Sequence, residues 1–336
     1  MNVTLLGPQR RVTAARAAVA ELMPDGRIAT VNAGWQERET DSAELSDVLG
    51  GRMLNLELHR RWQQLTESDE EYAEAERRLT RLLAELQEVY AIRLNHQMAA
   101  LEALGRRGDV PAVQEAALID ALRAVQELDR WHLDVVAETR AEFFATVRLG
   151  ERDSIETPRA EIAAAVAECS GMVFAGGHVG VLLHLLHLFD ISRLIRLPLI
   201  AWSAGAMALS DRVVLFHDHA PQGDRHAEMY AEGLGVYSGV LPFPHARWRL
   251  RLDDPEHLGQ LARRFAPRSC LLLPDGTRVD VRDEAPLPPG SRVLDPAGGV
   301  RTVGPEPGAP EQTKNTTTHA TRAEQRVVTT GPGSSW

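Results

Sequence analysis

Apolar positions follow two different periods along the chain, and these periods predict its strands and helices. The opening segment contains two short apolar runs and a helical pattern between them: 3–6, about 11–22 and 28–31. The alternation returns after Pro158 with a helical pattern and three apolar runs: 159–169, 172–174, 197–202 and 212–216. Strands that alternate with helices pair in parallel. We therefore expect an α/β fold, a mainly parallel sheet with helices on both faces.

Residues 50–149 predict helix throughout, because they are rich in Leu, Ala, Glu and Arg and contain a single proline, Pro111. Apolar residues keep to helical spacing over 79–104 and again over 113–135, and Gly105 begins the break between the two runs. We expect two long antiparallel helices that pack like a coiled-coil hairpin. The primary interpretation is a structural insertion that could cap a site, and the alternative is an arm for self-assembly or partner binding.

These patterns divide the chain into three parts: an α/β catalytic domain at 1–49 and 151–300, a helical hairpin insertion at 50–150, and a tail at 301–336. The tail is dominated by Gly, Pro, Thr and Ser, so we expect it to be disordered.

Composition excludes several classes of protein. The 37 basic and 47 acidic residues give a net charge of −10, which disfavours a nucleic-acid partner. Only two cysteines occur, so neither a disulfide framework nor a cysteine zinc site is expected. No apolar segment is long enough for a membrane span and the N-terminus lacks the features of a secretory signal. We expect a cytoplasmic protein without membrane association.

The segment 198–206 is typical of a nucleophile elbow, because an apolar strand runs directly into Ser203 between small residues. Such a turn exposes the serine hydroxyl at the head of a helix. The general pattern is Gly-x-Ser-x-Gly, and here Ala201 takes the place of the first glycine. The alternative interpretation is a serine that caps a helix and has no catalytic role.

A serine nucleophile needs a base and an orienting carboxylate, and both residue types follow Ser203 in the order Asp, His. Asp218 comes just after the run at 212–216, and His245 follows a Pro-bounded segment. Other acids remain candidates for the orienting role: Asp211, Asp224, Glu228 and Glu232. A second alternative is a metal site built from histidines around Asp218: His217, His219 and His226.

Several separate segments resemble the dipeptidase E and cyanophycinase family of serine peptidases. The matching segments are Trp202-Ser203-Ala204-Gly205-Ala206, Phe174-Ala175-Gly176-Gly177, Pro244-His245 and Leu273-Pro274-Asp275-Gly276. The resemblance implies a fold like that of the class I glutamine amidotransferases, which is flavodoxin-like. It implies no metal and no cofactor.

The resemblance also implies roles: Ser203 as nucleophile, His245 as general base and acid, and Asp218 as the residue that orients the imidazole. The backbone N–H groups of Gly177 and Ala204 would form the oxyanion hole. Candidate substrate-lining residues are His178, Trp202 and His219, and His178 stands where the family commonly has asparagine.

The function predicted from these residues is serine hydrolysis of short peptides or isopeptides through an acyl-enzyme. The alternative is a catalytically inactive binding or scaffold protein, whose helical arm mediates assembly with itself or with a partner.

Overall fold

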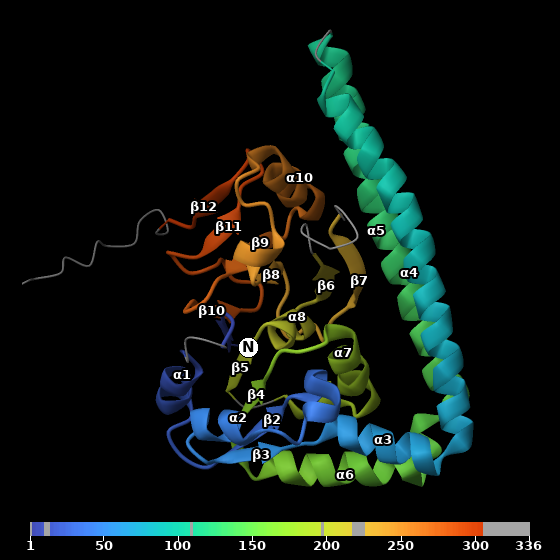
Figure 1. Cartoon of the computed structure of the whole chain (residues 1–336), viewed down its shortest axis with the longest axis vertical. Coiled ribbons are helices and arrows are strands. Elements are labelled where there is room, and N and C mark those ends of the chain that lie inside the picture. The colour runs from blue at the N-terminus through green and yellow to red at the C-terminus, as the bar shows by residue number, and fades with distance from the viewer. Residues whose placement is uncertain (1, 10–13, 108–109, 196–197, 217–225, 305–336) are drawn as a thin grey trace, which may run out of the picture. The chain divides into compact units, whose positions relative to one another are not determined.

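A mainly parallel sheet forms the centre of the computed structural model, which describes residues 2–9, 14–107, 110–195, 198–216 and 226–304 (Figure 1). Within these residues the sheet has the strand order β10-β1-β5-β4-β2-β3. Its strands are β1 (Asn2–Leu6), β2 (Arg27–Val31), β3 (Met53–Asn55), β4 (Cys169–Phe174), β5 (Leu199–Trp202) and β10 (Arg278–Arg282). Only β10 runs antiparallel to its neighbour, β1. The prediction of a mainly parallel sheet is confirmed.

Alternate residues of the central strands are buried on opposite faces, as the twofold period of a strand requires. On β5, Leu199 and Ala201 belong to the larger core cluster, whereas Ile200 and Trp202 belong to the smaller one. The smaller cluster takes in residues of α1 (Ala14–Leu22) and α2 (Ala43–Val48), and the larger takes in residues of α3 (Leu58–Ser68), α6 (Asp153–Ala167) and α7 (Val179–Leu188). Helices therefore cover both faces, as predicted.

Two smaller sheets stand beside the central one. One has the order β12-β11-β9-β8 and the other pairs β6 with β7. Their strands are β6 (Arg212–Leu215), β7 (Glu228–Glu232), β8 (Val240–Pro244), β9 (Ser269–Leu273), β11 (Arg292–Leu294) and β12 (Val300–Thr302). Apart from two long helices that form the hairpin, the remaining described helices are α8 (Ala204–Leu209), α9 (Ala246–Arg249), α10 (Pro255–Phe265) and the short 3₁₀ helices η1 (Ala33–Arg38), η2 (Leu149–Glu151) and η3 (Ile191–Leu194).

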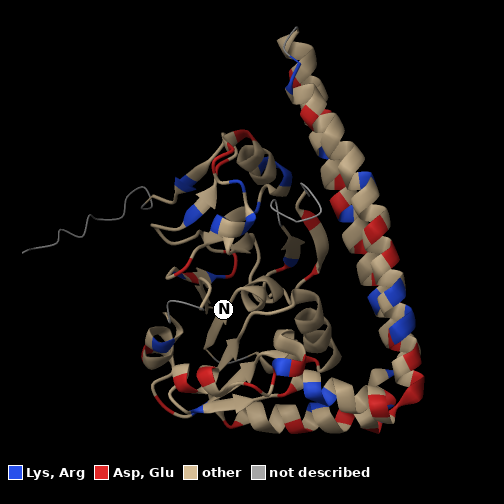
Figure 2. Cartoon of the chain, viewed as in Figure 1, with Lys and Arg blue, Asp and Glu red and all other residues tan. Residues whose placement is uncertain are grey.

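The predicted hairpin consists of α4 (Glu70–Gly105) and α5 (Pro111–Val147), which run side by side (Figure 1). The side chain of Asp69 caps α4 by accepting a hydrogen bond from Tyr72 N at 3.0 Å, and Pro111 occupies the first position of α5. Acidic and basic residues are interspersed along both helices (Figure 2).

The expectation of helix throughout 50–149 is wrong at β3, which adds a parallel edge strand next to β2. Met-Leu-Asn carries no β-branched residue, so no local signal marks it as a strand. The backbone of β2 supplies the pairing instead. At the other end of the chain, Arg301 and Thr302 belong to β12, and the rest of the predicted tail from residue 305 lies outside the described residues.

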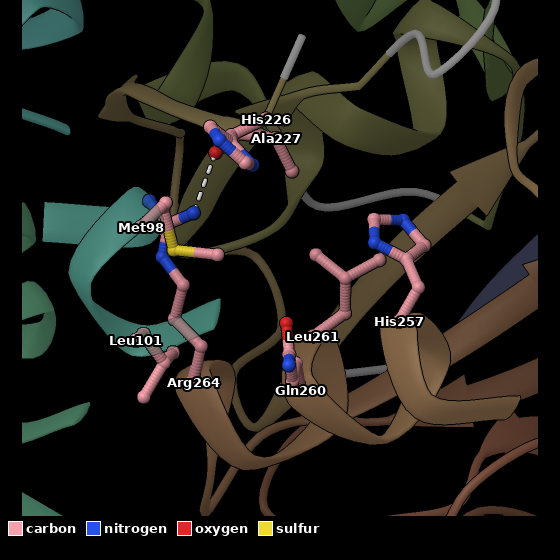
Figure 3. Close-up of a pocket in the computed structure, with 8 residues that line it drawn as sticks. All are labelled: Met98, Leu101, His226, Ala227, His257, Gln260, Leu261 and Arg264. Atoms are coloured by element: carbon pink, nitrogen blue, oxygen red, sulfur yellow. Dashed lines mark hydrogen bonds between the residues drawn. The ribbon is translucent and has the colours of Figure 1, made fainter. Parts of the chain in front are cut away.

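A buried ion pair joins the hairpin to the α/β body. Arg264 of α10 donates to both carboxylate oxygens of Asp129 of α5, at 2.8 and 2.7 Å. Tyr90 of α4 donates its hydroxyl to Asp129 at 2.7 Å and accepts from Met229 N of β7 at 3.0 Å. Arg264 also donates to the carbonyl oxygen of Ala227 at 2.7 Å (Figure 3). One charge pair therefore joins both helices of the hairpin to α10 and to the segment around β7.

His132 of α5 is fully buried beside this ion pair. Its ring stacks on Tyr90 with centroids 4.2 Å apart, and its Nε2 lies 3.0 Å from Gln87 Oε1. Burial disfavours the charged imidazolium and lowers the pKa of His132 to about 4. His132 is therefore a neutral packing residue at neutral pH.

No helix in the part of the chain that the structure describes has the length and apolar content that a membrane crossing requires.

Removing the carboxylate of the buried pair should destabilise the fold. We expect Asp129→Ala to lower the free energy of unfolding by about 3–5 kcal/mol, because it leaves the Arg264 guanidinium buried without its counter-charge. Urea denaturation followed by circular dichroism measures this. The matched control is Glu74→Ala, which breaks the exposed pair with Arg78 and should cost about 0–1 kcal/mol. Equal costs for the two variants would contradict the assignment.

Acid should weaken the same region through His132. The unfolded imidazole titrates near pH 6.5 and the folded one near 4, so the unfolded chain binds more protons between these values. We expect this group's contribution to stability, about 3 kcal/mol, to be complete above pH 6.5 and to be lost as the pH falls to 4. His132→Phe keeps the stacking and removes the titration. Urea titrations at pH 7 and pH 4.5 should therefore show a smaller loss in the variant than in the wild type.

Candidate active site

Ser203 lies on a strained turn where β5 ends and α8 begins. Its backbone angles are φ 52° and ψ −124°, a conformation that residues with a Cβ rarely adopt and that costs about 1–3 kcal/mol. Small neighbours allow the turn, because a Cβ on Gly205 would lie 2.3 Å from the carbonyl oxygen of Phe174. The local geometry is that of the predicted strand-to-helix turn.

His245 faces Ser203 from a different sheet. It follows β8 in a left-handed conformation with φ 58°, and its Nε2 lies 3.1 Å from Ser203 Oγ. This distance is within hydrogen-bonding range for a nucleophile and its base. The two residues are 42 positions apart, and only the packing of β8 beside the central sheet brings them together.

The glycine turn after β4 packs directly against Ser203. A Cβ on Gly176 would lie 2.8 Å from Ser203 Cβ, so this position has no room for a side chain. Gly177 has φ 113°, and a Cβ there would lie 2.3 Å from the backbone of Gly34. Both positions therefore require glycine, because Gly176 lies too close to Ser203 and Gly177 too close to the loop after β2 for either to carry a side chain.

Two backbone donors of this region have no acceptor among the described residues: the N–H groups of Gly177 and Ala204. The next N–H along the turn, that of His178, is already used and donates to Gly34 O at 2.7 Å. The turn therefore leaves Gly177 N–H, rather than His178 N–H, available for a ligand.

His178 caps α7 with its side chain, because its Nδ1 accepts a hydrogen bond from Val181 N at 3.2 Å. In the neutral ring this places the proton on Nε2, which makes Nε2 a donor. The imidazole is exposed next to the glycine turn. Tyr230 of β7 packs against the same first turn of α7, where a Cβ on Gly180 would lie 2.5 Å from the Tyr230 hydroxyl. Nothing in the local sequence of β7 marks Tyr230 as a neighbour of the site.

The other predicted site residues have different surroundings. Trp202 is 6% exposed and packs in the smaller core cluster. Asp218 and His219 lie outside the described residues, as do His217 and Asp224.

Two of the rival acids have other partners. Asp211 accepts from Arg268 at 2.6 and 2.9 Å, and Glu228 accepts from Gln87 at 2.8 Å. Among the residues with described positions, no cluster of three metal-ligating side chains occurs. The assignment of Asp218 as the acid that orients His245 therefore stays a prediction.

Two cavities lie elsewhere in the described part of the chain. One of about 10 Å³ is enclosed by α4, α10 and the segment before β7, next to Arg264 (Figure 3). The other, about 330 Å³, borders β10 and the loop before β11. Neither is lined by Ser203 or His245.

Comparisons with known proteins identify no family. No protein-family model matches the chain, and no curated protein matches its sequence. Among solved structures, the chain is similar to a peptidase from an acI-B1 Actinobacterium, with 15% identity over 66% of this chain and 89% of that chain and a TM-score of 0.28. A likeness of this size carries no argument about activity. What the fold and site define is a mixed α/β protein in which a strained serine faces a histidine.

The strain at Ser203 can be measured through stability. We expect Ser203→Gly to be more stable than Ser203→Ala by about 1–2 kcal/mol, because glycine adopts a positive φ freely and alanine does not. Both variants lose the contact with His245 equally, so their difference isolates the backbone strain. Urea denaturation gives both values. An alanine variant as stable as the glycine variant would show that the turn is relaxed.

Proposed function

We propose that the protein is a serine hydrolase that cleaves short peptides or isopeptides. The observation that carries the proposal is the placement of Ser203 Oγ, on a strained strand-to-helix turn, 3.1 Å from His245 Nε2. An N-cap serine needs no such partner, and the Ser203 side chain makes no capping hydrogen bond. A serine that accepts no backbone N–H is free to act as a nucleophile.

In the proposed reaction, His245 Nε2 takes the hydroxyl proton of Ser203 while Oγ attacks the carbonyl carbon of the scissile amide. The N–H groups of Gly177 and Ala204 stabilise the negative oxygen that forms, and one such donor typically accounts for about 100- to 1,000-fold in rate. The imidazolium then returns the proton to the leaving amine as the C–N bond breaks. Water, activated by His245, hydrolyses the resulting ester and regenerates Ser203.

The remaining parts of the proposal rest on the resemblance to the dipeptidase E and cyanophycinase family. Asp218 would orient the His245 imidazole and stabilise its charged form. His178, with its Nε2–H exposed beside the glycine turn, is a candidate donor to the substrate. The hairpin supports the site indirectly, since α5 packs against β7, and Tyr230 of β7 packs against the first turn of α7. No cofactor takes part in the proposed mechanism.

A second candidate function, assembly through the hairpin, is favoured by one observation. Three large apolar side chains of α4 are exposed at helical spacing: Leu82 at 49%, Val89 at 39% and Ile92 at 54%. An apolar stripe of this kind can pair with a second copy of the chain. Such assembly is compatible with hydrolysis and would replace it only if Ser203 proved inactive.

Turnover of a mixed panel of Asp-X dipeptides, β-aspartyl-arginine dipeptides and neutral short peptides tests the proposal by mass spectrometry. We expect Ser203→Ala and His245→Ala each to lower kcat by about 10⁴- to 10⁶-fold, since the pair acts as a unit. Ser192→Ala, an exposed serine elsewhere on the chain, is the control and should be unchanged.

Labelling with a fluorophosphonate probe gives a second readout that depends on the nucleophile and not on substrate recognition. We expect labelling of the wild type and of Ser192→Ala, and none of Ser203→Ala. An unlabelled wild type that also cleaves no peptide would refute hydrolysis and favour the assembly function.

A further inference from the structure

Gln36 adopts almost the same strained backbone conformation as Ser203. Its angles are φ 58° and ψ −128°, against φ 52° and ψ −124° at Ser203. Such a conformation costs about 1–3 kcal/mol at a residue with a Cβ, and it persists only where the surrounding structure enforces it. Strain of this kind clusters at sites of function. The strained backbone of Gln36 therefore points to a functional role, as it does at Ser203.

Gln36 and Ser203 lie on the same edge of the central sheet. Gln36 is in η1, directly after β2, and Ser203 directly follows β5, with β4 between these two parallel strands. The carboxyl ends of parallel strands share one edge, which is where open α/β sheets bind ligands. The loop of Gln36 is also in contact with the site, because Gly34 O accepts from His178 N at 2.7 Å.

A buried frame holds the backbone around Gln36. Asn32, which is fully buried, donates its side-chain N–H to Glu39 O at 2.7 Å, and Glu39 N donates to Gln36 O at 2.8 Å. The carboxylate of Glu39 is buried in turn and accepts from Arg60 N at 2.9 Å at the start of α3. The frame uses the backbone of Gln36 and not its side chain.

The Gln36 side-chain amide has no hydrogen-bond partner among the described residues. The residue is partly exposed. A primary amide presents two N–H donors and one carbonyl acceptor. This is the complement of a peptide group, which offers one carbonyl and one N–H.

We propose that Gln36 is a specificity-determining residue whose side-chain amide binds a peptide group of the substrate beside the glycine turn. The inference rests on the proposed serine hydrolysis and adds to it a second binding position across β4 from the nucleophile. The enforced backbone fixes the position of the Gln36 Cβ before substrate arrives, so that binding has to order only the side chain. The chemical class of ligand is a short peptide, recognised through its backbone.

The test uses Gln36→Ala, Gln36→Gly and Gln36→Glu, with Glu37→Ala as the matched control on an exposed neighbour. The substrates are the peptides of the panel above that the wild type cleaves. Loss of a hydrogen bond to an uncharged group should raise KM by about tenfold in the first two variants, with kcat changed less than KM. Gln36→Glu should lose at least as much, because a carboxylate has no donor. The control should match the wild type.

Two further readouts separate this inference from the proposed function. Fluorophosphonate labelling of the Gln36 variants should equal that of the wild type within about twofold, because the probe needs Ser203 and His245 and not peptide recognition. Gln36→Gly should be more stable than Gln36→Ala by about 1–2 kcal/mol in urea denaturation, since glycine relieves the strain.

Three results would overturn the inference. A KM within twofold of the wild type for Gln36→Ala and Gln36→Gly would overturn the inference while intact labelling left the proposed function standing. A wild type that is not labelled and cleaves no peptide would refute both. Equal stability of the alanine and glycine variants would remove the strain argument and with it the inference.

Discussion

The buried pair between Asp129 and Arg264 is the interaction that links the hairpin to the rest of the molecule. A charge taken out of water is tolerated only when its partner and its remaining hydrogen bonds are all in place. Here those partners come from α4, α5, α10 and the segment around β7. These elements must therefore assemble together, which makes the hairpin a part of the fold and not a freely attached arm.

The elements around this ion pair are connected to the candidate site in two ways. The chain leaves α10 and enters β9, which pairs in parallel with β8 and so positions His245. The other route runs through β7, whose Tyr230 packs on the first turn of α7 beside the glycine turn. The geometry that aligns His245 with Ser203 thus depends on contacts well removed from both. The strained backbone conformations of Ser203 and Gln36 persist because the stability of this packing outweighs the free energy that the strain costs.

The pattern of the sequence was sufficient for the hairpin and for four strands of the central sheet: β1, β2, β4 and β5. The alternation of β5 side chains between the two faces of the sheet and the helical repeat of α4 are local properties, because strand side chains point to alternate faces and helix side chains repeat every 3.6 residues. The signal for the elbow was equally local, because an apolar strand that runs into a serine between small neighbours predicts the turn, although the surrounding packing holds it in its strained conformation. The strand β3 was not predicted, because none of its three residues is β-branched or aromatic and they pair only because β2 offers a free edge.

The sequence by itself determined the class of fold, the two helices of the hairpin and the position of Ser203 at the end of its strand, whereas the strand that precedes His245, β8, was not predicted. Only the tertiary structure decided that Ser203 Oγ and His245 Nε2 would lie 3.1 Å apart, because they belong to different sheets whose relative placement no local pattern encodes. It also decided the conformation of Gln36, since a positive φ at a residue with a Cβ is imposed by the buried contacts of Asn32 and Glu39 and leaves no mark on the sequence.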